Sequence, residues 1–170
     1  MSRETLQRLT FDPGLNRLPL WTPDSQRVAF TAQRDGTENI YWQAADGSGT
    51  AEPLSEGETL RGPKSFTPDT TRLVFTQPLA PPYDIGVITI DGDRQVEMLL
   101  ETSFSETNGE LSPDGEWLAY ESTESGQSEI YLRPFPDVQT SRQQVSTGGG
   151  SRPLSSRDGR EPFSYVAPGT

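Results

Sequence analysis

The chain contains no cysteine and no histidine. The absence of cysteine excludes a disulfide, a thiolate metal site and a cysteine nucleophile. The absence of histidine removes the usual general base and the commonest transition-metal ligand, so neither a Ser-His-Asp nor a Cys-His triad can form. The sequence also has no Gly-x-Ser-x-Gly nucleophile elbow and no Gly-x-x-x-x-Gly-Lys phosphate loop. We therefore expect no hydrolase, kinase or transition-metal activity in this chain, and no cofactor.

Positive charge is scarce. The 14 lysines and arginines are outnumbered by 25 aspartates and glutamates, which gives a net charge of -11. This charge repels the phosphate backbone of DNA and RNA, so nucleic-acid binding is not expected. No hydrophobic run approaches membrane-spanning length, and Met1 to Thr10 lacks the apolar segment of a signal peptide. We expect a chain that does not insert into a membrane and that, as given, stays in the cytoplasm, unless a leader precedes it.

The sequence does contain a gapless repeat. Similar four-residue motifs recur every 45 residues: Trp21-Thr22-Pro23-Asp24, Phe66-Thr67-Pro68-Asp69 and Leu111-Ser112-Pro113-Asp114. The same interval relates four sets of apolar residues: Leu9, Leu54 and Leu99; Val28, Leu73 and Leu118; Phe30, Phe75 and Tyr120; Ile40, Ile85 and Ile130. Like side chains at a constant interval indicate one supersecondary unit copied in tandem.

Each repeat has the pattern of short strands rather than of helices. In the first copy, apolar and polar residues alternate over Leu18–Trp21, Arg27–Gln33 and Asn39–Ala44, and a fourth short run ends near Leu54. Turn residues separate these runs. Four antiparallel strands in about 45 residues match the size of one β-propeller blade.

The fold class is therefore all-β, with blades of four antiparallel strands in a single repeat domain over residues 1–170. Three complete blades are expected at 16–56, 61–101 and 106–147, with a stray fourth strand at 5–10 and a degraded partial blade at 151–170. The last copy is degraded because Ser155 replaces Trp21, Ser164 replaces Phe30, and Pro162 falls inside the second strand, where it removes a ladder donor.

The motifs also resemble a known family. Trp21-Thr22-Pro23-Asp24 followed by Arg27-Val28-Ala29-Phe30, and Ser112-Pro113-Asp114-Gly115 followed by Glu129-Ile130-Tyr131, are similar to the PD40, or WD40-like, repeat of TolB-like propellers. The segment Ile130–Pro136 is similar to propeller regions attached to bacterial serine/threonine kinases. This resemblance implies a bacterial protein with a propeller fold. TolB-like relatives are often periplasmic, and related propellers gate prolyl-oligopeptidase-like peptidases.

The expected function is that of a non-enzymatic module that binds a protein or peptide. Loops on a rigid scaffold carry such functions. One alternative is an accessory or sensor domain of a larger enzyme, a peptidase or a kinase. Another is a truncated propeller without a selected ligand.

Four charged residues lie where the chain enters the inner strands, close to one end of the predicted channel: Arg17, Arg61, Glu106 and Arg152. We expect a binding surface at this channel mouth, and the alternative is that these residues are solvated loop charges.

The other acidic residues predict turns rather than metal ligands. Asp24, Asp69, Asp114 and Asp158 recur at the turn of each copy, where an aspartate bonds its own backbone. Asp91-Gly92-Asp93 and Asp35-Gly36 are rich in oxygen ligands but lack the ligand series of an EF-hand. No metal site is therefore expected.

Two expectations concern packing and assembly. Trp21, Phe66 and Leu111 are expected to pack in equivalent places between neighbouring blades. About three blades leave two open flanks where a TolB-like ring has six, so we expect a homodimer in which each copy completes the propeller of the other. The competing arrangement is a four-bladed monomer, in which Leu6–Thr10 pairs with strands around Arg160–Tyr165.

Overall fold

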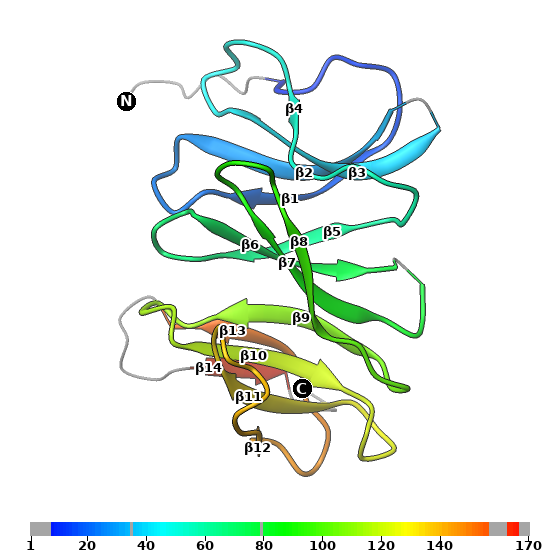
Figure 1. Ribbon diagram of the computed structural model, residues 1–170, viewed down its shortest axis with the longest axis vertical. Helices are drawn as coiled ribbons and strands as arrows, with labels where there is room; N and C mark the ends of the chain where they lie inside the picture. Colours follow the sequence, from blue (N-terminus) through cyan, green and yellow to red (C-terminus); the bar gives the residue numbers. More distant parts are fainter. Residues whose placement is uncertain (1–7, 35, 79, 157–162, 167–170) are drawn as a thin grey trace.

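The structure is a computed structural model that describes residues 8–34, 36–78, 80–156 and 163–166, and these residues form strands and loops without a helix. Three antiparallel sheets have four strands each, and a fourth sheet has two (Figure 1). This arrangement confirms the expected all-β class. The described residues include no helix that could cross a membrane.

The strands follow one another in chain order within each sheet. Sheet 1 contains β1 (Asn16–Trp21), β2 (Arg27–Arg34), β3 (Thr37–Ala44) and β4 (Glu52–Pro53). Sheet 2 contains β5 (Gly62–Phe66), β6 (Arg72–Gln77), β7 (Asp84–Thr89) and β8 (Val96–Leu100). Sheet 3 contains β9 (Glu106–Leu111), β10 (Trp117–Ser122), β11 (Glu129–Pro134) and β12 (Gln143–Gln144). Sheet 4 contains β13 (Ser151–Ser155) and β14 (Phe163–Val166).

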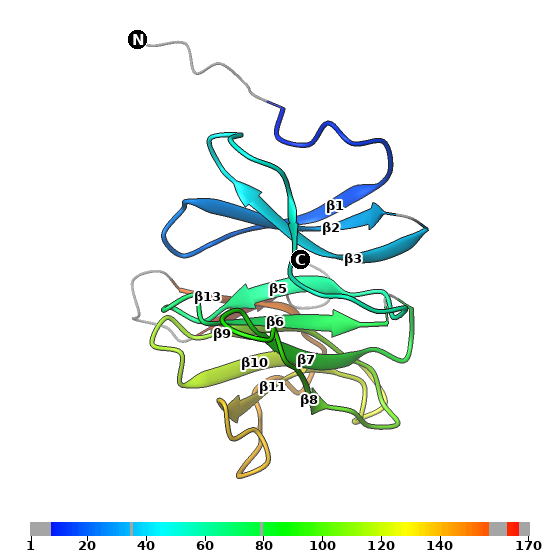
Figure 2. The same ribbon diagram turned by 45° about the horizontal axis from the view of Figure 1, so that its top comes forward.

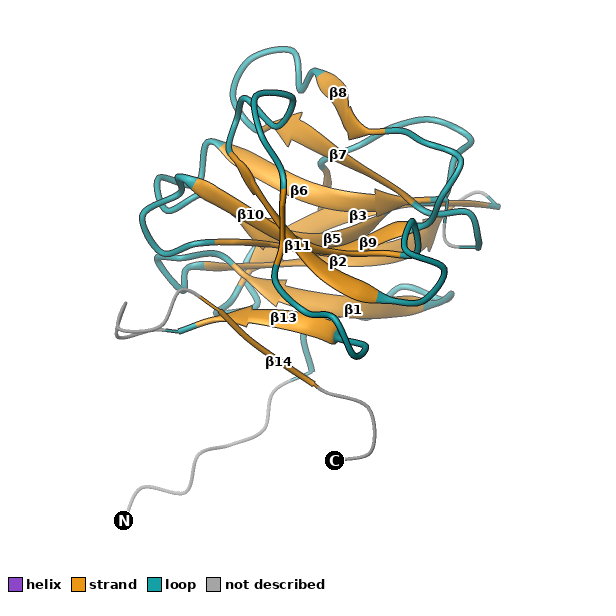
Figure 3. Ribbon diagram, turned by 90° about the horizontal axis from the view of Figure 1, so that it is seen from below, coloured by secondary structure: helices purple, strands orange, loops and turns teal. Residues whose placement is uncertain are grey.

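The sheets are stacked face to face in the order of the sequence. Figure 1 shows sheet 1 at the top, sheet 2 below it, and sheet 3 near the bottom with β13 and β14 beside it; Figure 2 shows the same stack tilted. We call the face of a sheet that points to the preceding sheet its leading face, and the opposite one its trailing face. The innermost strands β1, β5, β9 and β13 contact one another in sequence, as the blades of a propeller require (Figure 3).

Apolar residues at the repeated positions fill the spaces between sheets. Between sheets 1 and 2, the cluster includes Ala29, Ile40, Leu73 and Phe75. The equivalent residues of the next copies, Val74, Ile85, Leu118 and Tyr120, fill the space between sheets 2 and 3. The strict repeat of the sequence therefore places the same faces in contact at each junction.

Each innermost strand carries a bulge. The register shifts between Arg17 and Leu20, and equivalent shifts occur in β5, β9 and β13. Leu18, Asn108 and Arg152 occupy the bulges with positive φ angles of 55°, 52° and 53°. In β5 the bulge contains Pro63, whose ring excludes a positive φ. A bulge bends a strand and turns the following side chains, so it aims the second half of each inner strand.

The two ends of the chain differ from the regular sheets. Residues 8–15 form no strand, and residues 5–7 of the expected stray strand lie outside the described residues. Leu9 packs on the leading face of sheet 1 against Val28 and Phe30, which is the place that Leu54 and Leu99 take in the later junctions. At the other end, β13 and β14 pair as a two-stranded sheet, while Pro162 lies outside the described part.

The structure corrects one expectation about packing. Phe66 and Leu111 are buried between sheets, with 7% and 3% of their surface exposed, but Trp21 is 59% exposed. All three pair with the second strand of their sheet in the same register, opposite Leu73, Leu118 and Val28 respectively. Trp21 is exposed because it lies on the leading face of sheet 1, and among the described residues no sheet precedes that face.

Candidate functional site

The inner strands of sheets 1 to 3 end in three equivalent turns. In the second turn, Thr67 Oγ1 donates to Asp69 Oδ1 at 2.6 Å, and the same oxygen of Asp69 accepts from the backbone N of Thr71 at 3.0 Å. The Thr67 hydroxyl oxygen also accepts from the backbone N of Arg72 at 3.0 Å. The Thr22 to Asp24 and Ser112 to Asp114 turns repeat these bonds.

These hydrogen bonds stabilise the ionised aspartates. The side-chain bond from Thr67 is the largest cause that lowers the pKa of Asp69, to about 2, and equivalent bonds lower the pKa of Asp24 and Asp114. The three carboxylates therefore hold the turns together, as the sequence predicted. Asp158, the fourth member, lies outside the described residues.

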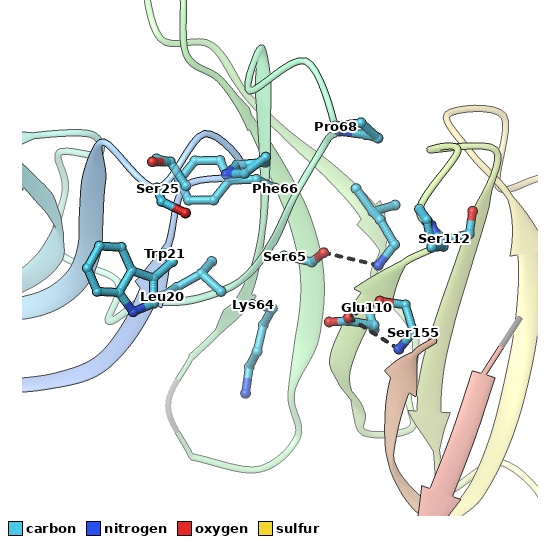
Figure 4. A pocket seen from close by; sticks show the side chains of 14 residues that line it. Leu20, Trp21, Ser25, Lys64, Ser65, Phe66, Pro68, Glu110, Ser112 and Ser155 are labelled. Carbon is cyan, nitrogen blue, oxygen red and sulfur yellow. Dashed lines mark hydrogen bonds between the residues drawn. The ribbon is translucent and has the colours of Figure 1, made fainter. Parts of the chain in front are cut away.

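A hollow of about 840 Å³ opens where these inner strands end. Figure 4 shows Leu20 and Trp21 on the left, Phe66 and Pro68 toward the top, and Glu110 with Ser155 on the right. The wall is thus built from the ends of β1, β5, β9 and β13. It combines an exposed indole, aliphatic surface and two ionisable groups, Lys64 and Glu110.

Lys64 is the cation of this hollow. Its ammonium Nζ donates to Asn108 Oδ1 at 2.8 Å. Burial lowers the pKa of Lys64, and the negative charge of Glu121 opposes that shift. Glu121 in turn accepts a bond from Asn108 Nδ2 at 2.5 Å and one from the backbone N of Arg152 at 2.6 Å. A chain of hydrogen bonds therefore joins sheets 2, 3 and 4 and fixes the amine at the wall.

Glu110 is the acid of the hollow. Burial raises the pKa of the Glu110 carboxyl, while hydrogen bonds from Ser155 oppose the shift. The Ser155 hydroxyl donates to Glu110 Oε1 at 2.8 Å, and the backbone N of Ser155 donates to the same oxygen at 3.4 Å. The wall thus has one positive and one negative group among apolar side chains and hydroxyl groups. Such a wall suits the polar backbone and the apolar side chains of a peptide.

The sequence did not point to Lys64 and Glu110. Both lie in inner strands at positions where the first copy has apolar residues, Pro19 and Leu20. The signal available in the sequence was a charged residue that replaces an apolar one at a repeated inner-strand position. Where such a side chain points depends on the bulge in the strand, and the repeat alone does not reveal the bulge.

The four residues expected at the channel mouth lie at the other ends of the inner strands. Arg17 forms an ion pair with Glu38 of its own sheet. Arg61 donates to Gln77 Oε1 at 2.8 Å and to the carbonyl oxygen of Glu56 at 2.9 Å. These bonds hold two of the four side chains within or beside their own sheets.

The other two expected residues differ strongly in exposure. Arg152 is exposed, and its backbone rather than its side chain makes the bond to Glu121. Glu106 is 2% exposed, and its Oε1 accepts from Thr102 and Ser122, at 2.8 Å and 3.4 Å. Its Oε2 is buried without a hydrogen-bond partner among the described residues. The four side chains are thus not gathered into one charged cluster by any of these bonds.

The side chains around the hollow define what it can offer a ligand. In the described ranges, no group of three or more acidic residues has the geometry to hold a metal ion. The hollow contains hydroxyl groups, Ser25, Ser65, Ser112 and Ser155, but the sequence has no histidine to serve as their base. The arrangement offers hydrogen bonds, charge and apolar surface to a ligand.

Comparison with known proteins identifies the fold. No protein-family model matches the sequence, and no curated protein matches it either. Among solved structures, TolB from Acinetobacter baumannii is similar with a TM-score of 0.82 and 24% identity, over 98% of this chain and 42% of that chain. A putative TolB from Agrobacterium tumefaciens is similar with a TM-score of 0.68 and 20% identity, over 78% of this chain and 47% of that chain.

Propellers of peptidases are also similar. A puromycin-hydrolyzing peptidase of Mycobacterium tuberculosis has a TM-score of 0.66 and 18% identity, over 85% of this chain and 27% of that one. These likenesses confirm the resemblance found in the repeats. The fold is a partial propeller of the TolB type, and the chain spans less than half the length of the TolB chains that it matches.

Proposed function

We propose that this partial TolB-type propeller is a non-enzymatic module that binds a protein or peptide and that completes its ring with a second copy of itself. The hollow at the ends of the inner strands is the observation that carries the binding role. It lies on a rigid scaffold and places Leu20, Lys64 and Glu110 around one space. Apolar surface with a few placed polar groups is typical of sites that bind a ligand.

The two ends of the stack of sheets support the second copy. The leading face of the first sheet carries the apolar residues Val28, Phe30 and Ala32 and the exposed Trp21, and the last sheet has two strands among the described residues. A twofold partner covers both ends at once, because the leading end of each copy meets the trailing end of the other.

Light scattering coupled to size-exclusion chromatography tests the assembly. We expect a species of twice 18.7 kDa at micromolar concentration. A stable species of 18.7 kDa under these conditions would contradict the dimer.

Selection from a displayed library of random peptides tests the binding role. We expect selected peptides to bind the chain and to lose binding on Lys64→Ala or Glu110→Ala substitution. The matched variant Arg152→Ala changes an exposed charge at the other ends of the inner strands. Loss of binding in this variant alone would favour the channel mouth predicted from the sequence, while failure to select any peptide would contradict the role.

Activity assays test the non-enzymatic part. The chain has no histidine and no cysteine, so we expect no turnover of ester, peptide or phosphate substrates above the blank. Turnover at a rate that a single carboxylate substitution removes would contradict this expectation.

The likeness to peptidase propellers favours a second candidate function, that of an accessory domain of a larger enzyme. In that role the chain would guard access to a catalytic domain rather than catalyse. An immunoblot of the source cells with antibodies to this chain distinguishes the two. A band at 18.7 kDa supports the free module, and a band of much larger mass supports the accessory domain.

A further inference from the structure

Two large apolar side chains are exposed at opposite ends of the stack of sheets. Trp21, on the leading face of sheet 1, is 59% exposed, and Leu154, in β13 of sheet 4, is also 59% exposed. Within the chain these residues belong to the first and the last sheet. Their places in the repeat explain why both side chains are exposed to solvent.

A regular contact joins neighbouring inner strands near the hollow. Leu20 packs against the apolar cluster that contains Phe66 of the next inner strand. The Ser65 hydroxyl oxygen accepts a bond from the backbone N of Leu111 at 3.1 Å (Figure 4). Glu110 accepts bonds from Ser155 in the same way. One series of residues, Leu20, Ser65 and Glu110, thus lies beside a second series, Phe66, Leu111 and Ser155. The polar members of the first series accept the hydrogen bonds that the second series donates.

Each of the three junctions is either apolar or hydrogen-bonded. In the first, Leu20 packs against the apolar cluster that contains Phe66; in the second, a serine hydroxyl accepts from a backbone amide; in the third, a carboxylate accepts from a serine. An apolar residue therefore lies opposite an apolar residue, and a polar one opposite a hydrogen-bond donor. This matching is what packing without buried unpaired polar groups requires.

Leu154 and Trp21 are the unmatched members of these two series. Leu154 is the residue of β13 that is equivalent to Leu20 of β1 and Glu110 of β9. Each of the three follows the bulge of its strand and comes directly before the next member of the second series, Ser155 in the case of Leu154. Trp21 takes the place in β1 that Phe66 takes in β5. Leu154 and Trp21 are both large and apolar, as the two members of an apolar contact would be.

We propose that Leu154 of one copy packs against Trp21 of a second copy, and that this contact joins the trailing end of one chain to the leading end of the other. The inference rests on the proposed self-association and names its junction. The second copy is the occupant that carries both members of the pair. A twofold axis makes the contact occur twice, since each copy offers one Leu154 and one Trp21.

Because the chain has no cysteine, engineered cysteines report the junction directly. Trp21→Cys protein is mixed with Leu154→Cys protein and treated with a short bis-maleimide. We expect a covalent product of twice 18.7 kDa that contains one chain of each kind. The matched control pairs Leu154→Cys with Asp91→Cys, which lies exposed in the β7–β8 turn of the middle sheet and should not cross-link.

The outcomes separate the junction from the assembly. Products formed by Trp21→Cys protein alone would show that leading faces meet each other, and would overturn the proposed contact while the dimer stands. A dimer by light scattering without any product between positions 21 and 154 would do the same. A monomer at micromolar concentration would contradict both the contact and the self-association on which it rests.

Tryptophan fluorescence tests the contact without changing either partner. In a Trp42→Phe, Trp117→Phe background Trp21 is the only tryptophan, and excitation selective for tryptophan reports on it alone. We expect its emission to shift to shorter wavelength as concentration rises, because the indole leaves water on association. Leu154→Asp should abolish the shift and raise the dimer dissociation constant about tenfold or more. An unchanged spectrum throughout a transition from monomer to dimer would overturn the contact.

Discussion

The ring of Phe75 lies against the backbone of Gly86 so closely that a Cβ built on Gly86 would be 2.3 Å from the ring atom Cζ. In sheet 3 the equivalent residues are Tyr120 and Tyr131, whose rings stack with centroids 5.8 Å apart. Sheet 2 thus fills with one phenylalanine ring the space that two tyrosines share in sheet 3. The small residue in β7 is a packing requirement of this junction.

Replacing Gly86 by alanine is therefore expected to lower the free energy of unfolding by about 1–3 kcal/mol, because the ring must move within a packed core. Urea denaturation measures the change. Gly148→Ala is the control, since a Cβ there meets nothing within 4 Å. A second substitution, Phe75→Leu, should recover part of the loss by removing the ring; equal losses at Gly86 and Gly148 would contradict the steric account.

Phe66 and Trp21 should respond differently to truncation. Phe66→Ala removes a ring that is 7% exposed and should cost about 3–5 kcal/mol of unfolding free energy. Trp21→Ala removes a ring that is 59% exposed and should change stability by about 0.5 kcal/mol or less. Both are measured at concentrations low enough to keep the chain monomeric. A loss at Trp21 as large as that at Phe66 would show that this indole is buried within one chain.

The turn after each inner strand contains a residue with positive φ. Thr70 has φ of 62° and Gly115, its equivalent in the third turn, has φ of 75°. A β-branched residue is strained in this conformation. We expect Thr70→Gly to raise unfolding free energy by about 0.5–1 kcal/mol, and Gly115→Thr to lower it by at least as much. Thermal unfolding of the two variants checks the opposite signs.

The Asp69 carboxylate should stabilise the fold in a manner that depends on pH. Its pKa is lowered to about 2 in the folded protein, so its contribution is present above its ordinary pKa near 3.8 and is lost as the pH falls toward about 2. Asp69→Ala should lower the unfolding free energy by about 1 kcal/mol at neutral pH, through the lost hydrogen bonds.

The difference between wild type and Asp69→Ala should shrink as the solution is acidified, in a series of denaturant titrations. Asp93→Ala, in the exposed β7–β8 turn, is the control and should have little effect at any pH. A difference that stays constant down to strongly acidic pH would mean that the lowered pKa makes no contribution.

Glu106 should act in the opposite sense. Burial is the largest cause that raises the pKa of its carboxyl, and the nearby carboxylates of Asp84 and Glu124 add to the shift. A carboxyl whose pKa is raised in the folded state contributes its stability at a pH below the pKa of the unfolded state. That stability is lost as the pH rises through the pKa of the folded state. Glu106→Gln should therefore increase stability more at neutral than at acidic pH. Denaturant titrations across this range measure it, and a loss of stability at neutral pH would contradict the prediction.

The sequence by itself determined the unit and its local structure. The interval of 45 residues and the Thr-Pro-Asp and Ser-Pro-Asp turns predicted strands that the structure forms, because alternation of side chains and turn chemistry are local properties of the chain. The same interval predicted which residues face each other at an interior junction. Leu73 and Leu118 are buried alike because each has a sheet in front of it.

Only the tertiary structure decided which copies of a position are covered. Trp21 has the sequence signature of Phe66 but lies on a leading face without a preceding sheet, and burial depends on that neighbour rather than on the residue. Lys64 and Glu110 reach the hollow because bulges turn the inner strands. Glu106 is buried, although its charge predicted exposure, because Thr102 and Ser122 close around one of its oxygens. Neighbours and bulges are properties of the stack of sheets, which a repeat unit does not contain.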